Sequence, residues 1–254
     1  MEAQIYNMQK SRRITLIVIL TIVAVVAVST IAFFAYVGTY YHADESIVPA
    51  FMSSDEFVNV EYHKGEKFYS FEPKTSYDSA FVFIPGGKVE ARAYAPLMHE
   101  IAKGGVLCIL LEVKFNLAIL DKNAPKGIQD NYKDVNNWII GGHSLGGTVA
   151  SIYLSKNPTE YKGIVFLASF PEKDISSLDI KCLQIYGTCD KVLKRNQYEA
   201  AKSKCPKQTR EFIIEGGNHA QFGAYGAQKG DGVANISNSE QWAITAFEVL
   251  QLFA

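Results

Sequence analysis

The sequence is poor in cysteine: four occur in 254 residues, none in a C-x-x-C pair and none spaced with histidine as zinc ligands are. Neither sign of charge is in excess, since 25 basic residues face 26 acidic ones and the formal net charge is −1. A surface that binds nucleic acid or another polyanion is therefore not expected. We also expect no metal and no organic cofactor.

The positions of the cysteines suggest two kinds of environment. Cys108 and Cys182 lie inside apolar runs, so we interpret them as small core residues. Cys189 and Cys205 fall in predicted loops and could form a disulfide if the domain faced an oxidising space.

Apolar sequence is abundant near the N-terminus. Residues 14–37, ITLIVILTIVAVVAVSTIAFFAYV, contain no charged side chain. As a helix this run would rise about 36 Å, enough to cross a hydrocarbon core of about 30 Å. A cleaved signal peptide is the main alternative, but its apolar region usually spans only about 7–15 residues. No clear small-x-small cleavage site follows the run, so we predict a single membrane span.

The charges on either side of this run predict its orientation. Lys10, Arg12 and Arg13 precede it, whereas acidic residues follow it at positions 44 and 45. The positive-inside rule then leaves the N-terminal tail in the cytoplasm and the main domain outside the cell. The predicted organisation is a cytoplasmic tail (1–13), a transmembrane anchor (14–37), a tether (38–54) and a folded domain (55–254).

The remaining stretch of about 200 residues is long enough for one well-buried domain. Residues 57–73 alternate apolar and polar side chains around a Lys64-Gly65 turn, which predicts a hairpin. Short apolar strands and helices then alternate, so we predict an α/β fold with a mostly parallel central sheet flanked by helices. The predicted strands are 80–87, 106–113, 138–144, 163–169, 181–187 and 210–216, and the predicted helices are 90–105, 145–157, 194–204 and 239–253.

Two segments of this pattern are irregular. Pro96 lies inside the predicted helix 90–105 and is expected to kink it. Residues 114–137 have helix potential but no clean period.

The stretch WIIGGHSLGGTVA (138–150) contains one serine between glycines. Gly142-His143-Ser144-Leu145-Gly146 matches the G-x-S-x-G pattern, in which a serine occupies a sharp turn from strand to helix. A glycine-rich structural loop is the alternative. An apolar strand precedes the motif and a helix follows it, and this context favours Ser144 as a nucleophile.

A nucleophilic serine needs a base to take its proton and an acid to orient that base. On this architecture the chain order is serine, acid, histidine. Of the five histidines, only His219 follows Ser144 with acidic residues between them. It lies in a glycine-rich loop just beyond the last apolar strand, so we predict that His219 is the base.

Asp190 is the best candidate for the acid, because it follows strand 181–187 at the carboxyl end, where a parallel sheet gathers its functional groups. Asp174 follows the preceding strand and is a second choice, with Glu172 in the same loop a more distant one. Asp179 precedes a strand and so lies at the wrong edge of the sheet.

An oxyanion hole is the fourth requirement. One donor is expected to be the backbone N–H of Leu145, which follows the nucleophile, and the other the N–H of Gly87 in the loop after the strand that ends in FIPGG. Glycines there could instead simply end the strand.

With these residues assembled, the chain resembles the α/β-hydrolase superfamily, and more narrowly the bacterial α/β-hydrolase fold-5 group, which is dienelactone-hydrolase-like. The resemblance extends from about residue 55 to the end. It implies the same nucleophile, acid and base: Ser144, Asp190 and His219. It rests on four motifs of this sequence: PGGKVEARAYAPL, GGHSLGG, YGTCDKV and EGGNHAQFGAYGAQKGDGVANIS.

The chain departs from dienelactone hydrolases proper, which use a cysteine nucleophile, so their substrate is not implied. The stretch between residues 169 and 181 is too short for the large cap that many lipases of the superfamily carry. The walls of the substrate pocket are expected to include Gly86, His143, Gln221, Phe222 and Tyr225. A surface loop that only packs the last helix is an equal alternative for the segment after His219.

The sequence thus predicts a membrane-anchored serine hydrolase, a carboxylesterase acting on small or medium acyl esters. Its substrate would be a small-molecule or lipid-like ester outside the cell. Acyl transfer or thioester hydrolysis by the same triad, or a non-catalytic binding module on this scaffold, are the alternatives.

Overall fold

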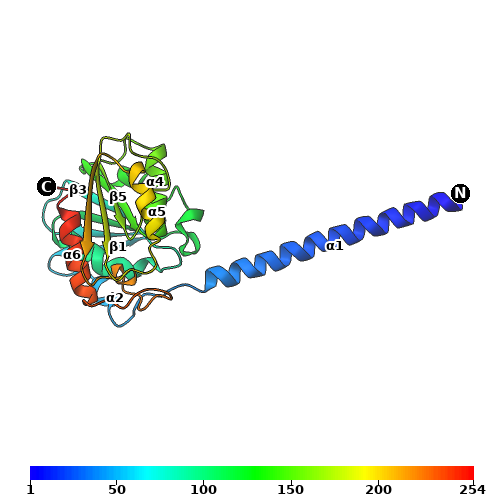
Figure 1. Ribbon diagram of the computed structural model, residues 1–254, viewed down its shortest axis with the longest axis horizontal. Coiled ribbons are helices and arrows are strands. Elements are labelled where there is room, and N and C mark those ends of the chain that lie inside the picture. Colours follow the sequence, from blue (N-terminus) through cyan, green and yellow to red (C-terminus); the bar gives the residue numbers. More distant parts are fainter. The chain divides into compact units, whose positions relative to one another are not determined.

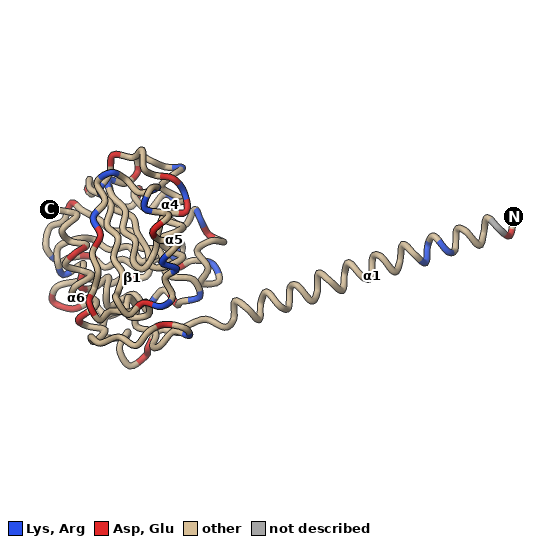
Figure 2. Tube along the Cα trace, viewed as in Figure 1, with Lys and Arg blue, Asp and Glu red and all other residues tan. Residues whose placement is uncertain are grey.

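The computed structural model describes residues 1–254, apart from the side chain of Ala3, and the chain forms two units, Met1–Thr39 and Tyr40–Ala254. The first unit is one helix, α1 (Glu2–Gly38). Its basic residues lie near its N-terminal end, and no charged residue follows Arg13 within it (Figure 2). Residues Gln4–Gly38 have a mean hydropathy of 2.9 in their most apolar window. The helix is therefore a candidate membrane span or signal sequence.

The second unit is built around one sheet of eight strands in the order β1-β2-β4-β3-β5-β6-β7-β8 (Figure 1). The first two strands form the predicted antiparallel hairpin, and β2 also pairs antiparallel with β4. All other pairs are parallel, which confirms the mostly parallel α/β sheet. The strands are β1 (Val58–His63), β2 (Phe68–Pro73), β3 (Ser79–Ile84), β4 (Leu107–Leu111), β5 (Asn137–His143), β6 (Gly163–Leu167), β7 (Lys181–Gly187) and β8 (Gln208–Ile214).

Helices cover both faces of the sheet because its central strands are apolar on both sides. Alternate residues of β3 enter two different cores: Phe81 and Phe83 pack with α3 and α6, whereas Ala80 and Val82 pack with α4. Figure 1 shows α6 and α4 on opposite sides of the strands. The helices are α2 (Val48–Phe51), α3 (Ala95–Lys103), α4 (Leu145–Lys156), α5 (Arg195–Ala201) and α6 (Asn238–Leu250).

Two predicted segments differ from the structure. The helix expected at 90–105 divides into a 3₁₀ turn, η1 (Ala91–Tyr94), and α3. Pro96 lies in the first turn of α3, where the missing N–H costs nothing, so it starts the helix instead of kinking it. The irregular stretch after β4 forms short 3₁₀ turns instead of a helix: η2 (Lys114–Asn116), η3 (Ala118–Leu120) and η4 (Ile128–Asn131).

The predicted tether also differs from the structure. Residues from Tyr40 onward belong to the folded unit. Tyr41 forms a parallel bridge with Val89, and its backbone bonds to Lys88 and Glu90. Val48 is completely buried in the core. The folded domain therefore begins at Tyr40 and not at residue 55, because this segment carries apolar side chains that the core takes in.

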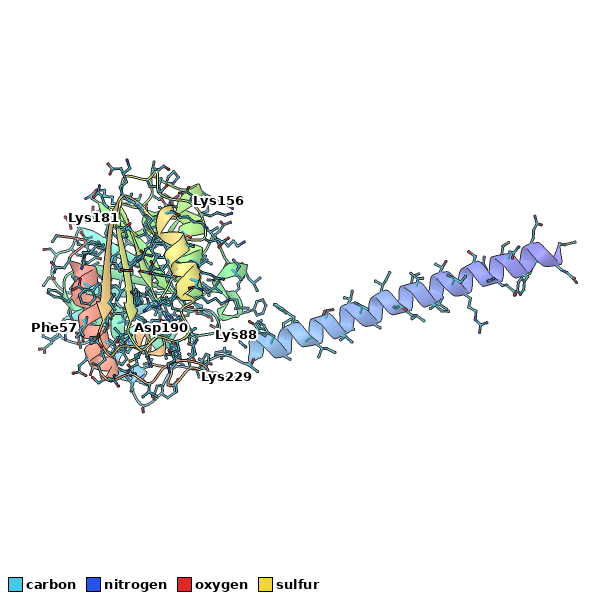
Figure 3. The ribbon with its side chains drawn as sticks, viewed as in Figure 1. Phe57, Lys88, Lys156, Lys181, Asp190 and Lys229 are labelled. Atoms are coloured by element: carbon cyan, nitrogen blue, oxygen red, sulfur yellow. The ribbon has the colours of Figure 1, made fainter. Side chains whose placement is uncertain are left out.

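The carboxyl ends of the parallel strands gather the candidate residues at one edge of the sheet. In Figure 3, Lys181 at the start of β7 and Asp190 just beyond its end lie toward opposite ends of that strand. No large cap interrupts the fold, since β6 and β7 are separated only by residues 168–180.

Candidate active site

Ser144 occupies the sharp turn between β5 and α4. Its backbone has φ 51° and ψ −120°, a left-handed conformation that is rare for a residue with a side chain and marks strain at functional turns. The turn is tight: a Cβ added to Gly142 or Gly146 would lie 2.5 or 2.0 Å from the Ile84 carbonyl oxygen. The two glycines are therefore needed for the turn that carries Ser144 to pack this closely against the end of β3.

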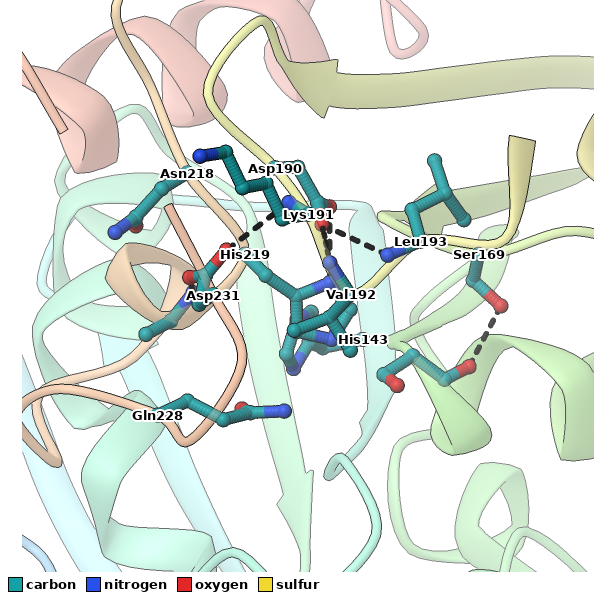
Figure 4. A network of polar contacts seen from close by, with 12 residues as sticks. His143, Ser169, Asp190, Lys191, Val192, Leu193, Asn218, His219, Gln228 and Asp231 are labelled. Atoms are coloured by element: carbon teal, nitrogen blue, oxygen red, sulfur yellow. Dashed lines mark hydrogen bonds and ion pairs between the residues drawn. The ribbon is translucent and has the colours of Figure 1, made fainter. Parts of the chain in front are cut away.

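Asp190 and His219 form a buried pair at the same edge. His219 Nδ1 lies 2.9 Å from Asp190 Oδ2, and the two side chains are 2% and 0% exposed. The other carboxylate oxygen, Oδ1, accepts the backbone N–H groups of Val192 and Leu193, each at 2.8 Å (Figure 4). The carboxylate is thus fixed by its own loop and presents one oxygen to the imidazole.

The opposite nitrogen of this imidazole is unoccupied. His219 Nε2 is buried and has no hydrogen-bond partner among the described residues, so no hydrogen bond joins it to Ser144 Oγ here. Ser144 and His219 nevertheless line the same pocket, which has a volume of about 330 Å³. Bonds of this kind are often long without substrate and shorten in the complex. The structure thus brings together the three residues that the sequence selected.

The two expected oxyanion donors lie beside each other. Leu145 is the first residue of α4, so its N–H has no acceptor within the helix. A Cβ on Gly87 would lie 2.9 Å from Leu145 Cδ2 and 3.3 Å from its Cβ, which places Gly87 against the side chain of Leu145. Neither N–H has a hydrogen-bond acceptor in the described part of the chain.

The pocket beside Ser144 has a different lining from the one the sequence predicted. Phe222 is completely buried, and Tyr225 is buried with its hydroxyl bonded to Gln228. Gln221 bonds to the Ile236 carbonyl and faces another pocket. Gly86 and His143 do not line the pocket of Ser144 either, so the pocket contains none of the five residues that were predicted as its walls. Its lining comes from Ser144, Leu145, Thr148, Ala168, Ser169, Phe170, Val192, Leu193, Lys194, Gln197 and His219.

The lining residues other than Ser144, Leu145 and His219 were not predicted from the sequence. The pocket walls were expected mainly in the segment after the candidate base His219, whereas several lining residues follow the candidate acid Asp190. The segment from Val192 to Gln197 leads from the Asp190 loop into α5. Its position directly after the predicted acid was the available signal. Lys194 is the one charged residue among those lining the pocket in the described structure.

Asp231 is a further residue that sequence reasoning missed. Its Oδ2 accepts the N–H of Ala220 at 2.8 Å, and its Oδ1 accepts that of Lys191 at 3.3 Å (Figure 4). These amides directly follow His219 and Asp190 in the chain. One carboxylate therefore joins the loop of the candidate base to the loop of the candidate acid.

His143, the residue before Ser144, lies beneath the site instead of lining it. It is 1% exposed, and its ring centroid is 4.5 Å from that of His219. His143 Nδ1 lies 2.8 Å from the hydroxyl oxygen of Tyr94. Burial, reinforced by the nearby His219, lowers the pKa of His143 well below its ordinary value, while burial raises that of Tyr94.

All four cysteines are free thiols. The neighbour of Cys205 is Cys182 and not Cys189, because Cys182 lies on β7 beside the loop that follows α5. The suggested Cys189–Cys205 disulfide is therefore wrong for this structure. Among the described residues no cluster of histidine, cysteine, aspartate and glutamate is arranged to hold a metal ion.

Comparison with known proteins agrees with this architecture. A family model described as "Alpha/beta hydrolase family" matches residues 80–243, a range that includes all three candidate residues. No curated protein matches the sequence.

Solved structures share the fold at low sequence identity. A predicted CIB-like hydrolase from Thermoplasma acidophilum has 17% identity and a TM-score of 0.55, with 77% of this chain and 99% of that chain covered. Est1E from Butyrivibrio proteoclasticus, also solved with ferulic acid bound, has 12% identity and a TM-score of 0.57, with 78% and 99% covered. TT1662 from Thermus thermophilus has 13% identity and a TM-score of 0.57, with 77% and 96% covered.

Proposed function

The chain belongs to the α/β-hydrolase family, and we propose that it is a membrane-anchored serine esterase with Ser144 as nucleophile, His219 as base and Asp190 as the orienting acid. One observation carries this proposal. Ser144, on a strained turn, and His219, bonded through Nδ1 to a buried carboxylate, line one pocket. A residue in a costly conformation beside a fixed base is typical of a nucleophile and unusual for a structural loop.

The geometry supports acyl transfer through an acyl-enzyme. Because Asp190 accepts a hydrogen bond from Nδ1–H of His219, the ring proton stays on Nδ1, and Nε2 is free to accept the proton of Ser144 as the Ser144 oxygen attacks the ester carbonyl. The N–H groups of Leu145 and Gly87 stabilise the resulting oxyanion, each contributing about 3–4 kcal/mol. His219 then protonates the departing alcohol, and water hydrolyses the acyl-enzyme by the same steps in reverse.

The pocket favours esters of small or medium size. A volume of about 330 Å³ lies at the lower end of ordinary ligand pockets, which span about 300–1,000 Å³. No cap domain extends it. Est1E, a fold relative that binds ferulic acid, supports a substrate of this size.

The membrane anchor is part of the proposal. The length and hydropathy of α1, the basic residues before its apolar run and the acidic residues after it favour a retained span with the catalytic domain outside the cell. Protease added to intact cells should then remove the domain. Cleavage that requires cell lysis would contradict this orientation.

Labelling with a fluorophosphonate probe tests the nucleophile directly. Modification that maps to Ser144 and disappears in Ser144→Ala is the expected result. Well-folded protein that takes up no label would contradict the proposed mechanism and favour a non-catalytic binding module. Esters of increasing acyl length would then measure the reach of the pocket.

A further inference from the structure

Two buried polar side chains beside the site have no part in the triad. Tyr94 ends the turn η1, His143 ends β5, and they are 0% and 1% exposed. A buried polar group is costly unless its hydrogen bonds are satisfied. Their partners therefore indicate what they do.

The hydrogen bonds of Tyr94 determine where its single proton lies. Its hydroxyl oxygen accepts the N–H of Gly86 at 3.1 Å and lies 2.8 Å from His143 Nδ1. Because Gly86 can only donate, the hydroxyl proton is directed to His143 Nδ1. That nitrogen must then accept, which makes the imidazole neutral with its proton on Nε2. The lowered pKa of His143 and the raised pKa of Tyr94 agree with a neutral pair.

His143 in turn packs against the candidate base. The ring centroids of His143 and His219 are 4.5 Å apart, and the backbone carbonyl of His219 faces the His143 ring. His143 Nε2 has no hydrogen-bond partner among the described residues. Since His219 gains a proton during the reaction, a charged ring at position 143 would oppose it by repulsion. A neutral His143 supports the base without this cost.

On its other side, Tyr94 bonds to the loop of Gly86 and Gly87, which carries the proposed oxyanion donor. A Cβ on Gly86 would lie 2.7 Å from the Tyr94 hydroxyl and 2.8 Å from His143 Nδ1, so a side chain at this position would displace both groups. Gly87, the proposed oxyanion donor, is the next residue. The orientation of its N–H therefore depends on where the Tyr94 hydroxyl holds Gly86.

We propose that Tyr94 and His143 are paired positioning residues, which connect the Gly86–Gly87 loop to the His219 ring. Directed hydrogen bonds run from Gly86 to Tyr94 and from Tyr94 to His143, and the His143 ring then packs against the His219 ring. The proposal rests on the proposed esterase function. Both ends of this chain act in the transition state, one on the oxyanion and the other on the proton, so its loss should lower kcat far more than it raises KM.

Kinetics of the full-length protein test this pairing. Tyr94→Phe should lower kcat about tenfold or more, with KM changed by less than about twofold. Tyr153→Phe is the matched control, because Tyr153 is also buried and its hydroxyl also donates a hydrogen bond, to Glu160, in the other core. Equal kcat values in the two variants would overturn the proposal.

Substitution of His143 separates positioning from packing. His143→Leu removes the acceptor, whereas the side-chain oxygen of His143→Asn can replace Nδ1 as acceptor for Tyr94. The Asn variant should recover part of the kcat that the Leu variant loses. Combining Tyr94→Phe with His143→Leu should cost little more than the worse single change, since both break the same chain. Additive losses, or a Leu variant as active as the Asn variant, would overturn the pairing.

Nitrogen NMR of ¹⁵N-histidine-labelled protein tests the network without using activity. His143, assigned by loss of its signals in His143→Asn, should be neutral at pH 7 with its proton on Nε2, and this preference should weaken in Tyr94→Phe. A charged ring or a proton on Nδ1 would overturn the proposal. If the probe fails to label Ser144 while the predicted tautomer is found, only the esterase function has failed.

Discussion

Replacing Asp190 by asparagine separates the orientation of His219 from the fold of its loop. The new side-chain oxygen can still accept the N–H groups of Val192 and Leu193, which now bond to Oδ1 at 2.8 Å each. Its NH₂ group then faces His219 Nδ1. The reverse orientation is excluded because it would set the NH₂ group against two backbone donors.

An NH₂ group at that position forces Nδ1 of His219 to accept, so the ring proton moves to Nε2. Nε2 can then no longer take the proton of Ser144. The equivalent exchange in a Ser-His-Asp protease lowers kcat roughly 10⁴-fold, which is about 5.4 kcal/mol in the barrier at about 1.36 kcal/mol for each tenfold. We expect a loss of this size with little change in stability. In Asp190→Ala the two loop amides also lose their acceptor, which should cost about 1–3 kcal/mol of stability.

Initial rates with a short-chain p-nitrophenyl ester measure the loss, and thermal melting measures the stability. Asp55→Asn is the matched control, because Asp55 Oδ1 also accepts two backbone amides at 2.8 Å, at the start of β1. Asp174→Asn tests the second candidate acid, which is exposed and bonds within its own turn to Ser176. The reasoning is refuted if Asp190→Asn keeps more than about a tenth of kcat, or if Asp174→Asn loses as much.

Three further predictions concern groups around the site. Burial holds the pKa of His143 below its ordinary value of 6.5, so unfolding takes up a proton at lower pH. The melting temperature should therefore fall as the pH drops below about 6.5. His143→Asn should reduce this dependence of melting temperature on pH, and an equal dependence in the two proteins would contradict the prediction. Cys189 is the one half-exposed cysteine among four free thiols, so one thiol should react with Ellman's reagent in native protein and none in Cys189→Ser; rapid reaction of a second thiol would argue against this burial. Asp231→Ala should lower kcat about tenfold with little change in KM, because the loops of acid and base lose their shared carboxylate; unchanged kcat in folded protein would show that the loops hold without it.

The sequence was sufficient for the features that follow from chain order and periodicity. The apolar run of β5, the glycines around Ser144 and the apolar helix behind it are contiguous, so their local geometry predicts the turn. His219 and Asp190 could be selected because each lies in the loop after a strand, and parallel strands end at one edge.

Contacts between distant segments could not be predicted in this way. Tyr94 and His143 are 49 positions apart, and neither carries a local pattern that marks a partner. The loop after His219 was expected to face the substrate, but the apolar side chain of Phe222 is buried in the hydrophobic core. Asp231 resembles an ordinary turn residue until the fold brings it beside two backbone amides. Such choices depend on tertiary packing, which periodicity does not encode.

If α1 is a retained membrane span, as we propose, the early start of the folded domain has a consequence for the release of that domain from the membrane. Helix α1 ends at Gly38 and the folded unit begins at Tyr40. A protease that releases the domain can therefore cut only a few peptide bonds without removing part of the folded unit. Cleavage there would free the complete folded unit, Tyr40–Ala254, into the surroundings. Cleavage beyond Val48 would withdraw a fully buried side chain, at a cost of about 1.5–3 kcal/mol, and would strip the segment paired with Val89. A difference of about ten residues in the site of the cut would thus decide whether the released domain keeps the stability of its intact fold or loses part of it.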